Sequence, residues 1–574
     1  MMRVCVLLLL MHALVAGVVF AEASQSAESN TDQSRRQVNR IHIDALDVFD
    51  PKLPQYRSWV FRFLNSLHNR TNDTFISREL LLREGDYFDQ DLLRESERNL
   101  RKHKFLDNIR IETVPVGAGK DDIFVHTEDQ WTTQVNIKAG TSSGNSEVGF
   151  SIEESNFLGL GKTVAMEFTD DVERSTYEAL YFDPQFLNSR WNFETSYEKA
   201  SDGWRQTTDL LRPFYSLDTK WAYGASMDSG SAVNRFYYKG RSVAEIDINH
   251  RTGVFFMARS WGKRYDKRKL AVLVGLDNLS YPHDARIIFP EATTVKSIKK
   301  NLHPIDRENY QYGGIFQLDR QNFVEETYID NFGRIEDLPV GFLLATQLAY
   351  AEAIKPVPDF YQIQTLAQYS HQLNDHQYFS LRGDFNIRKE STGDFSNMIF
   401  TGYAHYYLQT DQVRLGRFVF PRQTFAASLS TTLTQDVDAP FQLSLGEDEG
   451  LRGYTFKSFT GQNSLLFNVE DRIFTPLDFR IVAVGFAGFL DAGYVWSSEE
   501  TLRFKDFGVS VGIGLRIGLK KSQSARVIRV DFAIPLHKET GAFTRSNQKG
   551  YSISISSDQI FRVVENLPKL FQLF

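Results

Sequence analysis

The feature that most constrains this chain is a regular alternation of apolar with small or polar residues, which runs from Trp131 to about Phe561. In segment 507–519 every odd position holds a bulky apolar residue, whereas the even positions hold only glycine, serine or arginine. Successive side chains of a β-strand point to opposite faces, so one face of this strand is wholly apolar. An apolar face toward lipid and a small or charged face toward a lumen are typical of a transmembrane β-barrel.

A soluble β-sandwich also alternates, and it is the main alternative. Its apolar face would cover a finite core, however, and this region is far longer than one sandwich of about 100 residues. After the N-terminal segment no stretch reaches the ~18 apolar residues that a spanning helix needs, so a membrane location requires a closed barrel. We therefore predict a transmembrane antiparallel β-barrel over residues 131–561, followed by a C-terminal tail at 562–574.

The number of strands is harder to predict than their presence. The alternating region divides into about sixteen to twenty candidate strands, and an even number is expected. Segment 233–340 is the least readable part, because it holds polar stretches at 290–309 and 323–338 that we interpret as loops.

The N-terminus has the pattern of a secretory signal peptide at residues 1–23. Arg3 precedes a mostly apolar run that ends at Phe20, and small residues suitable for cleavage follow. A membrane anchor is the alternative, but the run is short and no stop-transfer pattern follows it. The single cysteine, Cys5, lies in this segment, so the mature chain is expected to have no disulfide and no thiolate chemistry. The polar residues 24–37 are expected to form a flexible leader.

Residues 38–130 are predicted to form a small α+β domain. Asp89 is a credible N-cap for a helix that buries Leu92, Leu93 and Leu100. The expected strands are 41–46, 108–112 and 122–126, and the expected helices are 58–69, 75–84 and 89–104.

This segment resembles a POTRA domain, the periplasmic module of outer-membrane assembly proteins. The resemblance rests on Gly85, Phe88, Asp89, Leu92, Leu100, Phe105, Ile109 and Ile111. Two departures are a lysine at 104, where the family usually has glycine, and a helix at 58–69 that looks inserted. The resemblance implies that the domain binds unfolded client strands by edge pairing. An unrelated small α+β domain is the alternative.

One loop motif, Leu451-Arg452-Gly453-Tyr454, directs attention to the far end of the chain. A loop arginine is most often a solvated charge. Here the parity of the following strands turns two carboxylates inward, Glu470 and Asp491, and Asp491 has mostly small neighbours that leave room for a guest side chain.

A guanidinium presents a rigid fork of donors that suits a carboxylate. We therefore predict that Arg452 folds into the lumen and is held by Asp491, with Glu470 as a second candidate partner. Gly453 would let the backbone pass close to the wall. The alternative for Glu470 is an ordinary pair with Arg472 on its own strand.

These motifs together resemble the BamA/TamA superfamily of outer-membrane assembly and secretion proteins. Leu451–Tyr454 matches its loop pattern [VIL]RG[FY], whose arginine pairs with the acidic residue of an F-x-D-x-G strand, matched at Phe489, Asp491 and Gly493. Further matches are N-V-E-x-R at 468–472, N-F-L-G-x-G at 156–161 and D-P-x-F at 183–186. The resemblance implies a barrel of sixteen strands whose first and last strands meet at a seam that can open toward a client. Ser554 and Ser556 make the last strand polar.

The expected function is insertion of proteins into the bacterial outer membrane or their translocation across it. The alternative is a passive or gated pore, or a structural barrel that handles no clients. Expected partners are outer-membrane lipid, unfolded or exported polypeptides and, as an open question, a further copy of the chain or a periplasmic accessory protein. The net charge of −7 is spread out and argues against nucleic acid. We expect no enzyme activity, cofactor or metal site, and a G-x-S-x-G string at 508–512 lies in mid-strand, where no nucleophile elbow forms.

Overall fold

The computed structural model describes residues 36–556, apart from 118, 143–144, 289–301, 303, 356, 417, 438–439, 480, 499, 523–526 and 538–550. The predicted signal peptide (1–23), the leader up to residue 35, the end of the predicted barrel after residue 556 and the tail at 562–574 lie outside the described residues.

The N-terminal part is α+β, as predicted. Its sheet has the order β1-β3-β2, in which β1 (Gln37–Leu46) runs parallel and β2 (Leu106–Gly117) antiparallel to β3 (Lys120–Asp129). Three α-helices accompany it: α2 (Trp59–Leu67), α3 (Asp73–Glu79) and α4 (Gln90–Lys102), with a short 3-10 turn η2 (Pro54–Tyr56) before α2. Asp89 caps α4 by accepting hydrogen bonds from the backbone N–H groups of Asp91 and Leu92 at 2.8 and 3.2 Å. Helix α3 is shorter than expected because the chain turns extended at Leu80.

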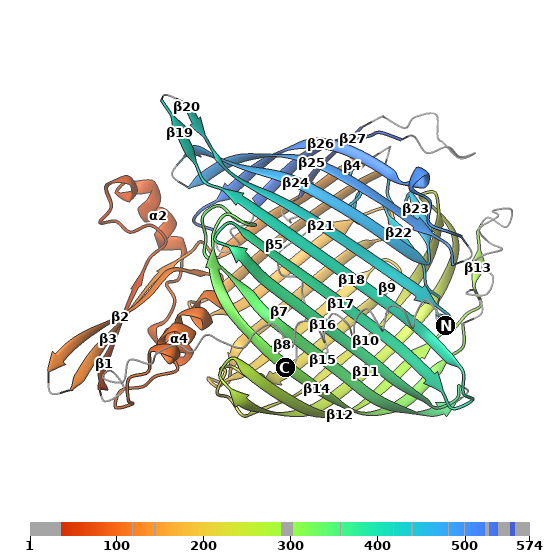
Figure 1. Ribbon diagram of the computed structural model, residues 1–574, viewed down its shortest axis with the longest axis horizontal. Helices are drawn as coiled ribbons and strands as arrows, with labels where there is room; N and C mark the ends of the chain where they lie inside the picture. Colours follow the sequence, from red (N-terminus) through yellow and green to blue (C-terminus); the bar gives the residue numbers. More distant parts are fainter. Residues whose placement is uncertain are drawn as a thin grey trace.

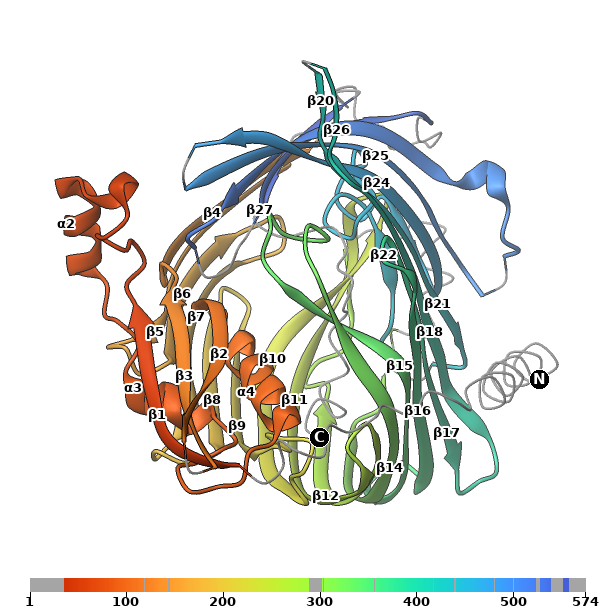
Figure 2. The same cartoon turned by 60° about the vertical axis from the view of Figure 1, so that its left-hand side comes forward.

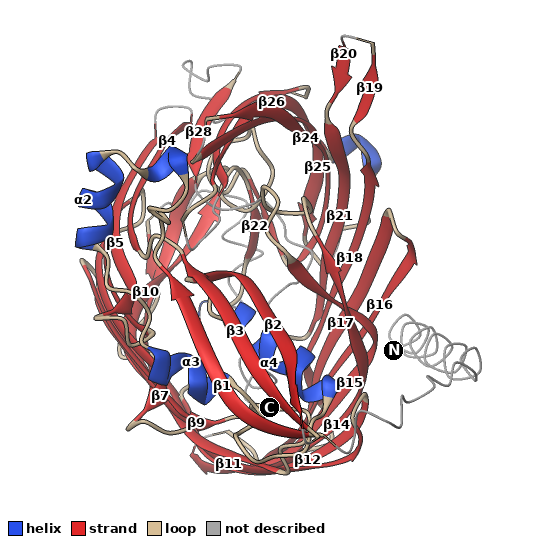
Figure 3. Cartoon of the chain, turned by 90° about the vertical axis from the view of Figure 1, so that its left-hand side faces the viewer, coloured by secondary structure: helices blue, strands red, loops and turns tan. Residues whose placement is uncertain are grey.

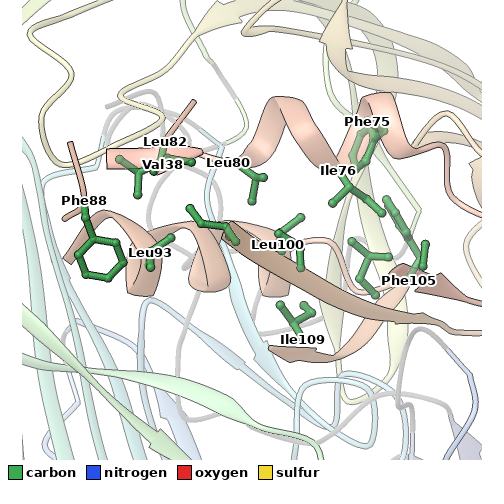
Figure 4. Packing of buried hydrophobic residues seen from close by; sticks show 14 residues of the cluster. Val38, Phe75, Ile76, Leu80, Leu82, Phe88, Leu93, Leu100, Phe105 and Ile109 are labelled. Atoms are coloured by element: carbon green, nitrogen blue, oxygen red, sulfur yellow. The ribbon is translucent and has the colours of Figure 1, made fainter. Parts of the chain in front are cut away.

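The core of this unit lies between the sheet and helices α3 and α4 (Figure 4). Strand β3 buries every second residue, so Ile123 and Val125 point inward, where they meet Leu100 of α4. Each such fully buried side chain contributes about 1.5–3 kcal/mol relative to exposure. Helix α2 lies outside this core and has no buried residue.

The remaining chain forms a closed antiparallel barrel, so the predicted fold class is confirmed (Figure 1). The residues that the structure describes form twenty wall strands, and β28 closes the ring by pairing with β4. Their bounds are β4 (Thr133–Ser142), β5 (Asn145–Phe157), β6 (Lys162–Asp170), β7 (Ser175–Phe186), β8 (Trp191–Ala200), β9 (Gly203–Arg212), β10 (Trp221–Tyr238), β11 (Arg241–Lys263), β12 (Asp266–Ser280), β14 (Arg307–Glu326), β15 (Glu336–Lys355), β16 (Phe360–Asn374), β17 (Gln377–Glu390), β18 (Phe395–Thr410), β21 (Arg422–Gln435), β24 (Asn463–Asp478), β25 (Val482–Trp496), β26 (Gly508–Leu519), β27 (Val527–Pro535) and β28 (Ser552–Ser556).

Shorter elements decorate the ends of the wall strands. They are β13 (Arg286–Ile287), the hairpin of β19 (Val413–Leu415) and β20 (Phe418–Phe420), the hairpin of β22 (Leu443–Leu445) and β23 (Phe459–Gly461), and the turn η4 (Phe504–Asp506).

The expected count of sixteen strands is wrong. Strands β10, β11, β12, β14 and β15 have 15 to 23 residues, whereas about 9–11 suffice to cross the hydrocarbon layer. Their ends therefore extend beyond the lipid and carry polar residues on both faces. The predicted loop 290–309 lies mostly outside the described residues, with β14 beginning near its end. The predicted loop 323–338 contains the β14–β15 connection at 327–335, but it also includes the last residues of β14 and the first of β15.

The alternation that predicted the barrel appears as alternating burial. On β26 the odd positions face outward, and Ile513 is 69% exposed, whereas Ser510 and Arg516 on the even face are buried. The apolar face is thus the outer one, which a soluble sandwich would not have. Within the described part of the chain, no helix has the length and apolar character to cross a membrane.

The N-terminal unit lies across one end of the barrel, as Figure 3 shows from that side. Glu95 of α4 accepts a hydrogen bond from the backbone N–H of Leu217, between β9 and β10, at 2.6 Å and pairs with Arg264. Arg101 of the same helix donates to both carboxylate oxygens of Asp337 on β15 at 3.0 Å. Charged contacts from one helix thus reach two places on the barrel rim, the turns beside β10 and β12 and the start of β15.

Candidate functional site

The loop that carries the predicted arginine connects β21 to β24 and returns to the barrel wall. Leu451 is fully buried in an apolar cluster with Leu445, Tyr454, Leu466 and Val495. Since Leu466 lies on β24 and Val495 on β25, this cluster fastens the loop to two wall strands and places Arg452 beside their buried face.

Arg452 is 1% exposed and binds carboxylates on three strands. Its Nε and Nη2 donate to the two oxygens of Asp491 at 2.7 and 2.8 Å, which is the bidentate geometry that favours arginine over lysine. Its Nη1 donates to Glu470 at 2.7 Å and to Asp531 at 3.3 Å. The structure thus brings together Arg452, Asp491 and Glu470, and it adds Asp531 of β27.

An aromatic ring forms the floor of this site. The guanidinium carbon of Arg452 lies 3.4 Å from the ring centroid of Phe489, so the charge also meets the negative face of a π-system. Phe489 in turn covers Gly512 of β26, where an added Cβ would come within 2.2 Å of the ring. Phe489 is the single bulky residue on the inward face of β25, and the glycine opposite provides its space.

The two residues after Arg452 fix the path of the loop. Gly453 has φ of +87°, and an added Cβ would lie 3.3 Å from Ser510 and from the backbone of Pro535. The hydroxyl of Tyr454 donates to the backbone oxygen of His537 at 3.0 Å and accepts from the N–H of Val509 at 2.9 Å. The motif therefore joins the loop to β26 and to the end of β27 as well.

Asn468 of β24 completes the cradle for the loop. Its side-chain amide donates to the backbone oxygen of Gly450 at 2.8 Å and to Asp491 at 2.7 Å. The same amide therefore holds the loop backbone and orients the carboxylate that Arg452 binds.

Glu470 has both of the partners between which the sequence left a choice. Besides Arg452 it accepts from Arg472 at 3.0 Å and from Arg516 at 3.4 Å. Arg516 and Arg529 also bind Asp531, at 2.5 and 2.7 Å. A buried charge is strongly destabilising without a partner, and in this cluster the positive and negative groups interleave, so each is paired.

A second loop reaches the same cluster from the other end of the barrel. The sequence predicted a loop at this place, but not its contacts with the cluster. Arg472 donates to the backbone oxygen of Ile329 at 2.9 Å and to Asp330 at 2.7 Å, both in the β14–β15 connection. Phe332 of this connection lies against Gly485 and Gly518, where an added Cβ would come within 2.9 and 2.3 Å of its ring. The glycines on the inward parity of β25 and β26 were the only sequence signal that something packs there.

The same loop contacts the N-terminal unit. Arg334 donates to the backbone oxygens of Lys104 and Leu106, at 3.0 and 3.3 Å. The β14–β15 connection therefore joins the buried charge cluster to the docked α+β unit.

Two further motifs singled out in the sequence lie at the contact between this unit and the barrel. The Asn156 amide donates to Thr71 at 2.8 Å, and an added Cβ at Gly159 or Gly161 would collide with Arg70 or Phe75. The turn 156–161 thus needs its glycines because the N-terminal unit packs directly on it.

The second of these motifs, 183–186, contacts helix α3. Gln185 donates to the Glu79 carboxylate at 2.6 Å and to the backbone oxygen of Phe75 at 3.2 Å. Both early motifs therefore hold the N-terminal unit in place.

In the described ranges, no three or more His, Cys, Asp or Glu side chains are grouped so that they would hold a metal ion. Asp531 and Arg516 are the main partners that sequence reasoning did not assign, although their parity placed them on the inward face.

An antiparallel barrel with an apolar outer surface and an α+β unit at one end defines an outer-membrane β-barrel protein. Residues 339–556 match the model of the Omp85 superfamily domain, which agrees with the superfamily that the motifs indicated. This places the barrel in the bacterial outer membrane and the N-terminal unit in the periplasm.

A curated relative supports the same family. The "Putative outer membrane protein assembly factor" of Treponema pallidum (strain Nichols) is 32% identical over 142 residues, which are 23% of this chain and 17% of the relative. The chain thus spans about a sixth of that relative's length.

Similar solved structures include BamA from Haemophilus ducreyi lacking POTRA domains 1–3, at 14% identity and a TM-score of 0.37, with 91% of this chain and 84% of that chain covered. CdiB from Escherichia coli is 10% identical with a TM-score of 0.43, covering 91% of this chain and 76% of that chain.

Proposed function

We propose that this protein inserts polypeptides into the outer membrane or moves them across it, with its loop pinned in the lumen by Arg452. The observation that carries the proposal is the buried cluster in which Arg452 joins Asp491, Glu470 and Asp531. A loop held this firmly to the inner face of the wall occupies the bore while leaving the outer face to lipid, so it guides or excludes a passing chain without performing chemistry.

The seam of the barrel supports a role with client strands. In the described residues β28 pairs with β4 at Ile553↔Thr141, Ser554↔Gly140 and Ile555↔Ala139, whereas β12 and β14 pair at thirteen positions. These are the fewest ladder pairs between neighbouring wall strands within the described residues, of which Ser556 is the last. Where such a seam opens, each strand edge becomes a template for a further strand.

The N-terminal unit, taken as a POTRA-like domain over 38–130, would receive the client first. Its sheet order leaves β1 and β2 as the outer strands, and edge strands pair readily with an extended peptide. Its position across the barrel mouth suits transfer from the sheet to the wall.

Conductance in planar bilayers separates this proposal from a passive pore. We expect the full chain to conduct little, because loops and the docked domain occupy the bore, and removal of residues 24–130 to change the conductance. A large steady conductance that is unaffected by that deletion would contradict a client-handling role.

Cysteine exchange tests the pin on its own. Arg452→Cys with Asp491→Cys, in a Cys5→Ser background, is expected to give a cross-link in the folded barrel. Arg414→Cys with Asp491→Cys is the matched control, because Arg414 is exposed on β19. Normal folding without a 452–491 cross-link would rule out the pinned loop.

A further inference from the structure

Helix α2 presents an apolar face that no described part of the chain covers. Trp59, Phe63 and Leu67 lie at positions i, i+4 and i+8 and are 71%, 54% and 57% exposed, and Val60 beside them is 42% exposed. Residues four apart share one side of a helix, so these four side chains form a single stripe. Large exposed apolar surfaces in a soluble environment mark binding sites.

The opposite side of α2 anchors the helix to the rest of the protein. Phe61 packs on Phe49 and Tyr56, with ring centroids 4.8 and 5.1 Å apart. The Asn65 side chain accepts from the backbone N–H of Phe49 at 3.2 Å and donates to its oxygen at 2.8 Å. The contacts of Phe61 and Asn65 therefore fix the orientation of α2, and the exposed stripe points away from the rest of the protein.

The packed side of α2 contacts the barrel at its rim, next to the outer surface of the wall. Phe61 and Leu64 pack in one cluster with Trp131, just before β4, and Ile481, in the β24–β25 turn. Figures 2 and 3 show α2 to the side of the barrel opening, whereas α3 and α4 lie by the opening itself. The helix is thus placed where the periplasmic leaflet of the membrane surrounds the barrel.

The apolar outer face of the barrel continues toward this point. Leu477 and Phe479, next to Ile481, are 50% and 64% exposed, and Val135 and Ile137 at the start of β4 are 58% and 67% exposed. These residues belong to the wall that contacts lipid, so the stripe on α2 lies next to an existing lipid interface.

The charge of this segment fits an anionic lipid surface. Residues 51–72 contain Lys52, Arg57, Arg62 and Arg70 but no aspartate or glutamate, although the whole chain has a net charge of −7. Arg70 pairs with Asp73, which follows the segment, at 3.3 Å, so Lys52, Arg57 and Arg62 are the cations for the membrane. Basic groups beside a Trp, Phe and Leu face are typical of helices that lie in the membrane interface, with the apolar face about 5–10 Å deep, and anionic headgroups attract such cations.

We propose that α2 is an interfacial anchor that binds the phospholipid of the periplasmic leaflet through Trp59, Val60, Phe63 and Leu67. It would hold the N-terminal unit against the membrane beneath the β25–β4 side of the barrel, where the β28–β4 seam lies. A client strand delivered along this unit would then meet lipid and seam at one place.

Site-specific fluorescence in the full chain tests this anchor. In a Cys5→Ser background the chain has no other cysteine, so Phe63→Cys or Leu67→Cys accepts one environment-sensitive label. The control is Ser58→Cys, an exposed position on the other flank whose side chain makes no capping hydrogen bond. The labelled proteins are reconstituted in vesicles of phosphatidylethanolamine and phosphatidylglycerol.

We expect the labels at 63 and 67 to be shifted to the blue, quenched by doxyl-labelled lipid and shielded several-fold from iodide, with the label at 58 open to iodide. Replacing phosphatidylglycerol by phosphatidylcholine is expected to weaken the shielding. Labels at 63 and 67 that iodide reaches as freely as at 58 would overturn the anchor and leave the stripe to a protein partner. Equal shielding with and without phosphatidylglycerol would contradict the proposal that the basic residues of this segment bind anionic headgroups.

Discussion

At the scale of single residues, Arg452 illustrates how a common side chain becomes specific through its surroundings. Its charge is satisfied only because Asp491, Glu470 and Asp531 converge from three strands, and its planar group fits over Phe489. The pairing with Asp491 followed from strand parity together with the fork geometry of arginine. The contribution of Asp531 did not, because parity gives the face of a strand but not how far along the wall a loop will reach.

Replacing Arg452 by lysine should destabilise the barrel although the charge remains. A single ammonium cannot reproduce the fork on Asp491 and the bond to Glu470 together, and leaving a buried charge partly unpaired costs about 2–4 kcal/mol. We expect Arg452→Lys to lower the temperature at which the compact barrel band is lost on cold gels. Arg414→Lys on the exposed β19 is the control, and equal temperatures for both variants would contradict a stabilising role for the fork.

Glu79 should make the docking of the N-terminal unit sensitive to acid. Burial raises the pKa of this carboxyl, but hydrogen bonds and positive charge from His103, with the Gln185 hydrogen bond and Arg190, lower it to about 2 from 4.5. Because the pKa is lower in the folded than in the unfolded state, the ionised carboxylate adds to the free energy of unfolding above pH 4.5. This contribution is lost as the pH falls from 4.5 toward 2.

Thermal unfolding of the N-terminal unit in the full chain, followed between pH 6 and 2.5, checks this expectation. The wild type should lose stability across the lower half of this range, and Glu79→Gln should show a clearly smaller change. Glu112→Gln, at an exposed position of β2, is expected to behave as the wild type. An unchanged pH profile in Glu79→Gln would assign the acid sensitivity to another group.

At the scale of elements, what could be predicted depended on whether a local pattern determines the structure. Amphipathic spacing placed α2 and α4 within two residues of their ends, and period two identified the barrel wall. The β14–β15 connection was predicted as a loop, but its contacts were not, because Ile329 and Phe332 pack on strands distant in sequence. The expected sixteen strands came from the resemblance, whereas the segmentation of the sequence allowed the twenty that the described residues form.

Crowding Phe332 should displace the β14–β15 connection. A valine at Gly518 would place its Cβ about where the ring now lies, so Gly518→Val is expected to release the connection and to expose Arg334 to trypsin. Gly488→Val on β25 is the matched control, since an added Cβ there meets nothing within 4 Å. The rate of cleavage after Arg334 measures the effect, and equal rates in the two variants would show that the ring does not hold the connection.

At the scale of the whole molecule, three parts of the chain restrict the opening of a wide barrel. They are the N-terminal unit across one end, the β21–β24 loop and the β14–β15 connection. Helix α4 touches the rim at separate places through Glu95 and Arg101. The parity of the wall could not reveal this arrangement, because docking depends on turns that the sequence shows only as isolated glycines, as at Gly159 and Gly161.

Weakening the contacts of α4 should open the periplasmic mouth. The double variant Glu95→Gln, Arg101→Ala removes the pairs with Arg264 and Asp337, so we expect a higher mean conductance in planar bilayers and more frequent openings. Arg94→Ala, on the exposed side of the same helix, should conduct as the wild type does. Conductance that remains low in the double variant would show that the mouth is closed by the loops alone.

The buried charges have one consequence for how the two sides of the membrane communicate. Arg452 on the outer loop contacts Glu470, Glu470 contacts Arg472, Arg472 contacts Asp330, and Arg334 a few residues on binds the backbone of the periplasmic unit. If a molecule at the cell surface captured the loop and withdrew Arg452, Glu470 would lose a partner, and we expect Arg472 and its contact with Asp330 to adjust. Any coupling carried by these contacts is reciprocal, so release of the periplasmic unit would then make the surface loop easier to extract.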